Sequence, residues 1–239
     1  MKSTENNKYK EDTKKGLYKN YFTKLHESEK YLEFTSTKIV NYDIVKYFKK
    51  NNKNNILDAG CGDGTFLKVA KKEGVRCEGF DNNEEFINLL KKDNFKTKYG
   101  DFSDKLPYSD NSFDGIYCSN VFEHLEEPEF ALYELLRILK KDGILIITVP
   151  EFDNLFYSDW THIKPFTRQT FDNILKCVEY KSYKIRKRHF PVIVRYWKNP
   201  IIKFGNLTIK KGIFAIIFTY LFERIFKIRR HDLILEVRK

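Results

Sequence analysis

The stretch Ile56-Leu57-Asp58-Ala59-Gly60-Cys61-Gly62-Asp63-Gly64 decides the fold of this chain. A short apolar run leads into three glycines at alternate positions, and the segment after Gly64 has the apolar spacing of a helix. This order predicts a strand, a tight turn and a helix. Because a turn with three glycines is entropically costly, it indicates a ligand that the backbone must approach closely.

Strands and helices alternate along the rest of the chain, which predicts a doubly wound α/β fold with a mostly parallel sheet. The expected strands are Asn55–Ala59, Arg76–Phe80, Phe95–Tyr99, Phe113–Cys118, Ile144–Val149, Tyr183–Arg188 and Leu233–Arg238. The expected helices are one after Gly64, one over Glu84–Lys92, one over Pro128–Lys140 that Gly143 stops, and one or two between residues 18 and 50.

Two carboxylates indicate what kind of ligand the loop binds. Asp81 ends the second expected strand, seventeen residues after Gly64, where it can accept hydrogen bonds from both hydroxyls of a ribose. Asp63 lies in the loop itself, where it would repel a pyrophosphate but tolerate a sulfonium. Thr65 also stands where a GxGxxG dinucleotide motif needs its last glycine. The ligand is therefore expected to contain a nucleoside but no pyrophosphate, which excludes a dinucleotide.

The stretch from Ile56 to Pro150 resembles the class I S-adenosylmethionine-dependent methyltransferases of the small-molecule branch called type 11. The matching segments are ILDAGCGDGTFL, EGFD, GDFSDKLPYSDNSFDGIYCSNVFEHLEEP and LLRILKKDGILIITVP. The resemblance implies a seven-stranded sheet with an antiparallel last strand, which Leu233–Arg238 could provide. It also implies S-adenosylmethionine as the cofactor, with these binding residues: Asp58, Gly60, Gly62, Gly64, Asp81, Asp101, Phe102 and Asn120.

The resemblance gives these residues separate roles. Gly60 and Gly62 would line the methionine part of the cofactor, and Asp81 would hold the ribose. Asp101 would accept the exocyclic amine of the adenine while Phe102 stacks on its ring. Core packing is the other role open to Phe102.

The length of 239 residues fits one large domain. We expect a disordered polar tail over residues 1–16 and a methyltransferase domain over 17–239. Within the domain we expect a helical cover (17–50), a cofactor-binding core (51–150), a lid or acceptor segment (151–180) and late strands with a helical insertion (181–239). No signal peptide is visible, so a cytoplasmic location is expected. The four cysteines form no CxxC pair, and no metal site is predicted.

Methyl transfer from a sulfonium needs a base only where the acceptor loses a proton. The candidate catalytic residues are Glu123 and His124, in a Glu-His pair that recurs in related methyltransferases, and His162. A structural hydrogen-bonding role stays open for His124. The pattern His162-x-x-Pro165-Phe166-Thr167 resembles one in bacterial and archaeal methyltransferases associated with glycan and lipid-linked saccharide modification. We therefore expect O-directed transfer to a small molecule, a saccharide or a lipid-linked acceptor.

The basic charge of the chain is concentrated in residues 176–239, which hold 17 Lys or Arg and 4 Asp or Glu. An amphipathic, phenylalanine-rich helix is predicted over about 209–230. Its apolar run is shorter than the roughly 20 residues that span a bilayer. It fits either an interfacial helix on an anionic inner membrane face or a helix packed in a dimer or core. Two alternative functions remain: an RNA methyltransferase, although no nucleic-acid-binding module accompanies the charge, and a non-catalytic S-adenosylmethionine-binding protein.

Overall fold

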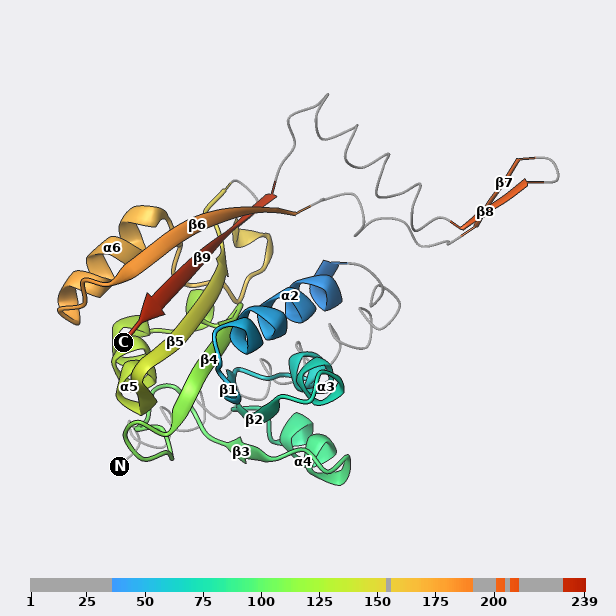
Figure 1. The fold of residues 1–239 in the computed structure, drawn as a ribbon. Helices are drawn as coiled ribbons and strands as arrows, with labels where there is room; N and C mark the ends of the chain where they lie inside the picture. Colours follow the sequence, from blue (N-terminus) through green and yellow to red (C-terminus); the bar gives the residue numbers. More distant parts are fainter. Residues whose placement is uncertain (1–35, 154–155, 191–200, 205–206, 211–229) are drawn as a thin grey trace, which may run out of the picture. The chain divides into compact units, whose positions relative to one another are not determined.

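The computed structural model describes residues 36–153, 156–190, 201–204, 207–210 and 230–239 (Figure 1). The strands are β1 (Asn55–Ala59), β2 (Arg76–Asp81), β3 (Thr97–Tyr99), β4 (Phe113–Ser119), β5 (Leu139–Pro150), β6 (Tyr183–Phe190), β7 (Ile201–Phe204), β8 (Leu207–Lys210) and β9 (Arg230–Arg238). The helices are α2 (Ser36–Lys50), α3 (Thr65–Lys72), α4 (Glu84–Lys92), α5 (Pro128–Ile138) and α6 (Arg168–Cys177), with short 3-10 helices η1 (Phe122–His124) and η2 (Phe156–Ser158).

Seven strands form one sheet in the order β3-β2-β1-β4-β5-β9-β6. β1 to β5 pair in parallel, whereas β9 is antiparallel to both of its neighbours, β5 and β6. The expected seven-stranded, mostly parallel sheet with an antiparallel last strand is therefore confirmed. The strand order reverses between β1 and β4, and ligands of open α/β sheets bind at the carboxyl ends of the strands at such a point.

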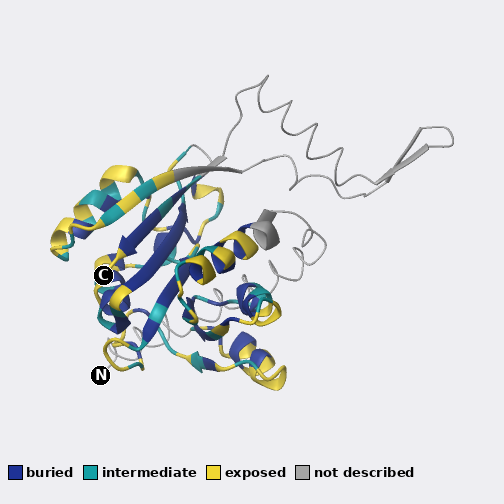
Figure 2. Ribbon diagram, viewed as in Figure 1, coloured by how far each residue is buried: buried dark blue, intermediate teal, exposed yellow. Residues whose placement is uncertain are grey.

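Both faces of the sheet are covered, as the buried central strands in Figure 2 show. In β5, Ile144 and Ile146 pack in a cluster with α2 and α3, while Leu145 and Ile147 pack in the larger cluster with α5 and α6. Because successive side chains of a strand point to opposite faces, a strand buried on both faces is apolar throughout. This pattern explains why Ile144–Val149 is the clearest strand in the sequence.

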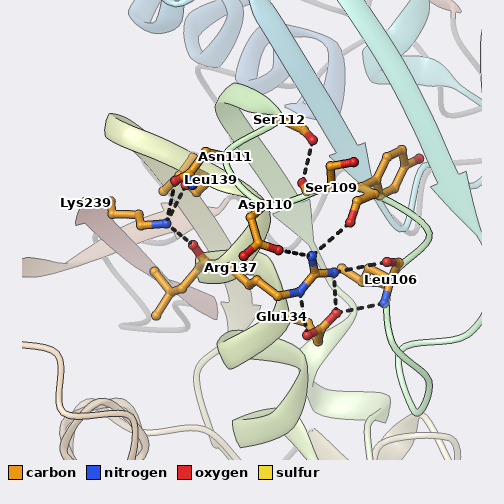
Figure 3. Close-up of polar contacts among 11 residues, drawn as sticks. Leu106, Ser109, Asp110, Asn111, Ser112, Glu134, Arg137, Leu139 and Lys239 are labelled. Carbon is orange, nitrogen blue, oxygen red and sulfur yellow. Dashed lines mark hydrogen bonds and ion pairs between the residues drawn. The ribbon is translucent and has the colours of Figure 1, made fainter.

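The prediction that α5 runs to Lys140 and is stopped by Gly143 is wrong. The helix ends at Ile138, and Gly143 lies within β5. The carbonyl of Ile138 accepts a hydrogen bond from Ser112 N–H (2.7 Å), which starts the pairing with β4. Lys239 Nζ donates to the carbonyls of Leu136 (2.8 Å) and Leu139 (2.7 Å), as Figure 3 shows. A cation from the chain's last residue thus binds the helix terminus.

Arg137 on α5 fixes the loop before β4 (Figure 3). Its guanidinium binds both carboxylate oxygens of Glu134, at 2.8 and 2.7 Å, and Oδ1 of Asp110 at 2.7 Å. It also donates to the carbonyls of Tyr108 and Leu106. Glu134 is only 3% exposed, so the guanidinium compensates a buried charge. This network holds the segment between β3 and β4 against the helix.

Other boundaries differ from the predictions. The third strand begins at Thr97, not Phe95, because Phe95 N–H closes the turn after α4 on the carbonyl of Leu90. The predicted helix over 209–230 is wrong at its ends: Ile209 and Lys210 lie in β8, which pairs with β7, and Arg230 lies in β9. Residues 211–229 and the expected tail over 1–16 lie outside the described residues, as do residues 17–35 of the helical cover, while α2 forms the rest of the cover. Among the described helices, none has the length and apolar character needed to cross a membrane.

Candidate active site

The three glycines of the loop after β1 all adopt a left-handed backbone, with φ of +85° at Gly60, +49° at Gly62 and +78° at Gly64. A Cβ added at Gly60 would overlap the side chain of Val121, and one added at Gly64 would overlap Leu90. Glycine is therefore required at these two positions by backbone conformation and by close packing within the protein. The backbone of Gly60 also donates to the carbonyl of Phe80 at 2.7 Å, which ties the loop to the end of β2.

Asp81, at the end of β2, holds the loop from its other side. Its Oδ2 accepts the N–H of Gly62 (2.8 Å), and its Oδ1 accepts the N–H of Asn83 (2.8 Å). Each carboxylate oxygen can accept a second hydrogen bond. The carboxylate is thus oriented beside the loop, and its ribose-binding role stays a prediction.

The loop is electronegative. Asp58 on β1 is 3% exposed, and its Oδ2 is buried without a hydrogen-bond partner among the described residues. Burial, and then the charges of Asp81 and Asp63, raise the pKa of Asp58 well above its ordinary value. A ligand with hydrogen-bond donors and positive charge would complete this site, whereas a pyrophosphate would be repelled. The residues present therefore fit S-adenosylmethionine.

Asp63 has a local structural contact. Its Oδ1 accepts both the N–H and the hydroxyl of Thr65, at 3.0 and 2.7 Å, where α3 begins. Asp101 accepts from Ser103, and its Oδ2 lies 3.2 Å from Nδ2 of Asn82. Asp101 and Asp81 thus lie beside the same Asn82–Asn83 turn, and their contacts with one nucleoside stay a prediction.

Phe102 is 7% exposed and packs edge-to-face on Phe80, with ring centroids 5.2 Å apart. These contacts are those of core packing, so adenine stacking by this ring stays a prediction. Asn120 follows β4 with a left-handed backbone (φ 52°), and its N–H donates to the carbonyl of Thr148 (2.9 Å). Asn120 is exposed and precedes Val121, whose side chain meets Gly60.

The three predicted catalytic residues lie together. One ligand-type atom from each of Glu123, His124 and His162 lies within 4.8 Å of the others. The rings of the two histidines are 4.9 Å apart, and Nε2 of His124 is 3.9 Å from Oε1 of Glu123. The carbonyl of Glu123 accepts the backbone N–H groups of Ile163 and Lys164, at 2.9 and 3.1 Å. These backbone bonds hold the segment after β5 against η1.

Hydrogen bonds at Nδ1 set the tautomer of both neutral rings. Nδ1 of His162 lies 2.7 Å from the carbonyl of Phe156, which can only accept, so Nδ1 carries the proton. Nδ1 of His124 lies 3.1 Å from both the carbonyl and the hydroxyl of Thr161. That hydroxyl donates to Oδ1 of Asp159 at 2.6 Å and can therefore only accept from the ring. Each ring consequently has its lone pair on Nε2.

Burial controls the charges in the cluster. Glu123 is 1% exposed, its Oε2 has no hydrogen-bond partner among the described residues, and burial raises its pKa well above the ordinary value. Burial lowers the pKa of His124 to about 4. His124 is therefore neutral near pH 7, as a proton acceptor or a metal ligand must be. The sequence indicated the three residues, but it did not reveal the supporting roles of Asp159 and Thr161.

An exposed aromatic surface adjoins His162. Phe152 is 47% exposed, Tyr157 and Trp160 are each 58% exposed, and Ile163 is 41% exposed. Phe156 packs beneath this surface, 5.1 Å from the ring of Tyr157 and 4.6 Å from that of His162. Large apolar side chains gathered on one surface segment mark an interaction site more often than single ones do. This segment is part of the predicted lid, and the closing motion of a lid stays a prediction.

Known proteins share the sequence and the fold. A family model described as "Methyltransferase domain" matches residues 57–147. Protein MJ0638 of Methanocaldococcus jannaschii is 32% identical over 195 residues, which cover 73% of this chain and 81% of that protein. Ajmaline N-methyltransferase of Rauvolfia serpentina is 31% identical over 102 residues, 39% of this chain and 35% of that enzyme. A SAM dependent methyltransferase from Archaeoglobus fulgidus superposes with a TM-score of 0.63 at 25% identity, covering 90% of this chain and 99% of that one.

The fold and the loop define an enzyme that binds S-adenosylmethionine at the carboxyl edge of a Rossmann-like sheet. The chain belongs to the class I S-adenosylmethionine-dependent methyltransferases. The family and the cofactor implied by the resemblance are thereby confirmed, and the chain is an enzyme of one-carbon transfer.

Proposed function

We propose that this enzyme methylates a hydroxyl group of a small, saccharide or lipid-linked acceptor. Glu123, His124 and His162 then form the group that removes the proton from this hydroxyl. The observation that carries the proposal is the convergence of these three side chains just after Val121, whose side chain meets Gly60 of the loop. S-adenosylmethionine supplies the activated methyl group when bound. The glycine loop and Asp81 would hold this cofactor, and Nε2 of His124 or His162 would accept the proton of the acceptor hydroxyl.

The aromatic surface supports a saccharide or lipid-linked acceptor. Tyr157 and Trp160 each present an apolar ring with a polar atom, which suits the face of a sugar ring. The basic residues of 176–239 favour an anionic partner. An RNA acceptor would use the same charge, but the chain offers no recognised RNA-binding module.

Transfer of a labelled methyl group to fractionated lipid, glycan and RNA extracts tests the acceptor class. Label in a base-resistant ether of a glycan or lipid-linked fraction supports the proposal, and label confined to RNA or to an amine contradicts it. Replacing His124 or His162 by glutamine should lower kcat by about 10²–10⁴-fold. The dissociation constant for S-adenosylmethionine should stay unchanged, and an unchanged kcat in both variants would remove the cluster from the mechanism.

We also propose contact with the inner membrane face through residues 211–229, on the basis of their phenylalanine-rich, basic sequence. Flotation with vesicles of phosphatidylglycerol and phosphatidylcholine tests this contact. Binding should require the anionic lipid and weaken with salt. Absence of flotation at low salt would leave a packing role for this segment.

A further inference from the structure

We propose that Glu123, His124 and His162 bind one divalent transition-metal ion of the zinc type, with at least one coordination position left open. Two imidazole nitrogens and one carboxylate are the protein ligands of one common kind of catalytic zinc site. The three candidate donor atoms lie within 4.8 Å of one another, and they come from η1 and from the segment after β5. Binding of the ion does not depend on the proposed acceptor, although its chemical role does.

The orientation of the imidazoles supports a metal site. Metal-bound histidines donate the second ring N–H to a carbonyl or carboxylate, which fixes the ring and directs the other nitrogen to the ion. Both histidines show this arrangement: His162 Nδ1 meets the carbonyl of Phe156 at 2.7 Å, and His124 Nδ1 meets the carbonyl and hydroxyl of Thr161 at 3.1 Å. The hydrogen bonds from His124 continue to Asp159, whose carboxylate accepts a hydrogen bond from the Thr161 hydroxyl at 2.6 Å. Nε2 of each histidine therefore carries the lone pair that could coordinate a cation.

The carboxylate of Glu123 supports a metal site independently of the two imidazoles. A buried charged group normally has a partner. Oε2 of Glu123 has none among the described residues, although the residue is only 1% exposed. Its other oxygen lies 3.9 Å from Nε2 of His124. A bound cation would compensate the buried carboxylate and explain why an acid is retained at this position.

The donor atoms lie within 4.8 Å of one another, so binding one ion would require some of them to move closer by up to about 1.5 Å. Ligand atoms of a tetrahedral zinc ion with bonds of about 2.0–2.1 Å lie about 3.3 Å apart. The 3.9 Å between Nε2 of His124 and Oε1 of Glu123 exceeds this by less than an ångström, which side-chain rotation can close. Oδ2 of Asp159 lies 3.9 Å from Nε2 of His162, so a second carboxylate stands beside the site.

A metal at this position would change how the acceptor is activated. A hydroxyl bound to zinc loses its proton more readily, because the ion stabilises the alkoxide. The imidazoles would then hold the ion, and the proton would pass to solvent or to a carboxylate such as Asp159. This role rests on the proposed O-methylation, whereas metal binding itself can be measured without any acceptor.

Direct metal binding by the full chain tests the proposal. Chelator-treated protein is titrated with Co²⁺ and with Zn²⁺, and bound metal is counted after gel filtration. The expected result is one equivalent per chain with the optical spectrum of a cobalt site with nitrogen and oxygen ligands. Glu123→Gln, His124→Gln and His162→Gln should each weaken binding by at least about tenfold.

Glu78→Gln is the matched control. Glu78 on β2 is also a buried glutamate (6% exposed) with an oxygen that lacks a hydrogen-bond partner among the described residues, but it pairs with Lys96 and lies outside the cluster. This variant should bind metal like the wild type. Calorimetry with S-adenosylmethionine checks that each variant is folded.

X-ray absorption of the wild-type zinc complex keeps the test independent of any variant. Two imidazoles and oxygen in the first coordination shell support the proposal, and sulfur scattering would contradict it by moving the ion to cysteines. Failure to bind one equivalent, or equal binding by all three cluster variants, would overturn the metal site. Such a failure would leave methyl transfer intact, and methyl transfer with chelator present would separate the two questions.

Discussion

Asp81 offers the sharpest test of the cofactor site, because its carboxylate performs two separable tasks. In the free protein its two oxygens each accept one backbone N–H, from Gly62 and from Asn83, at 2.8 Å. A carboxylate oxygen can accept more than one hydrogen bond, so a ribose hydroxyl could donate to each. Replacing Asp81 by alanine should therefore remove two hydrogen bonds to the cofactor and two that position the loop.

The cost to cofactor binding can be estimated from those contacts. A hydrogen bond to a charged group contributes about 1.5–3 kcal/mol, so two ribose hydroxyls contribute about 3–6 kcal/mol. At about 1.4 kcal/mol per tenfold change, the dissociation constant for S-adenosylmethionine should rise by about 10²–10⁴-fold in Asp81→Ala. Asp81→Asn should lie between this variant and the wild type, because the amide keeps one acceptor oxygen but loses the charge.

Isothermal calorimetry with S-adenosylhomocysteine and its 2′-deoxy and 3′-deoxy analogues separates the two tasks. Loss of a ribose hydroxyl should weaken binding to the wild type by about tenfold or more and should hardly affect Asp81→Ala. Asp63→Ala is the matched control in the same loop. Asp63 accepts from Thr65 at the start of α3, so its loss should lower stability by about 0.5–2 kcal/mol and change cofactor affinity little.

A dissociation constant for Asp81→Ala within threefold of the wild-type value, in protein that remains folded, would refute the assigned ribose contact. Equal penalties for the deoxy analogues in wild type and variant would show that Asp81 acts only through the loop.

Three further outcomes follow from other contacts. Arg137→Leu should lower the free energy of unfolding in urea by about 3–5 kcal/mol, because it leaves Glu134 buried without its bidentate partner. The guanidinium of Arg137 holds the pKa of Glu134 below its usual value. The difference in stability between wild type and variant should therefore shrink as the pH falls below about 4.5, where Glu134 is protonated in the unfolded chain before it is protonated in the folded one. A stability difference that does not change with pH would contradict this. Gly60→Ala should lower the free energy of unfolding, measured by heating, by about 1–3 kcal/mol, because Gly60 has a positive φ and a Cβ there would overlap Val121. Adding Val121→Ala should restore only the part of this loss that comes from the overlap. Full restoration would refute the argument from backbone conformation. Trp160→Ala should raise the KM for the acceptor by about threefold to tenfold without changing cofactor affinity, and a parallel loss of both would indicate a structural role.

The fold was predictable because its signals are local. The glycines after β1 and the apolar run 144–147 in β5 each reflect backbone and burial demands that act within a few residues. The end of α5 was not predictable, since Lys239 binds its last carbonyls from the far end of the chain. The β7–β8 hairpin was missed, although Gly205-Asn206 between two alternating segments is a known hairpin signal.

The site was predictable to the level of residue type and sheet edge. His124 follows β4 and His162 follows β5, and the carboxyl ends of these adjacent parallel strands meet at one edge. The ring tautomers were not predictable, because they depend on Thr161 and on the carbonyl of Phe156, which no spacing rule places beside the two rings. The sequence predicts no metal site for the same reason, since His162 lies in a different segment from Glu123 and His124.

Two buried carboxylates with unsatisfied oxygens, Asp58 and Glu123, lie at different parts of the active site. Each must lower the stability of the free enzyme, because a buried acceptor without a donor keeps its full desolvation cost. A ligand that satisfies such a group binds the folded state alone and so raises the free energy of unfolding by RT ln(1 + L/Kd), where L is the concentration of free ligand. The two groups respond to different ligands: Asp58 lies beside Asp63 and Asp81 at the loop, whereas Glu123 lies beside His124, Asp159 and Asp232. S-adenosylmethionine and a divalent cation should therefore raise the melting temperature independently, and Glu123→Gln should reduce only the response to the cation.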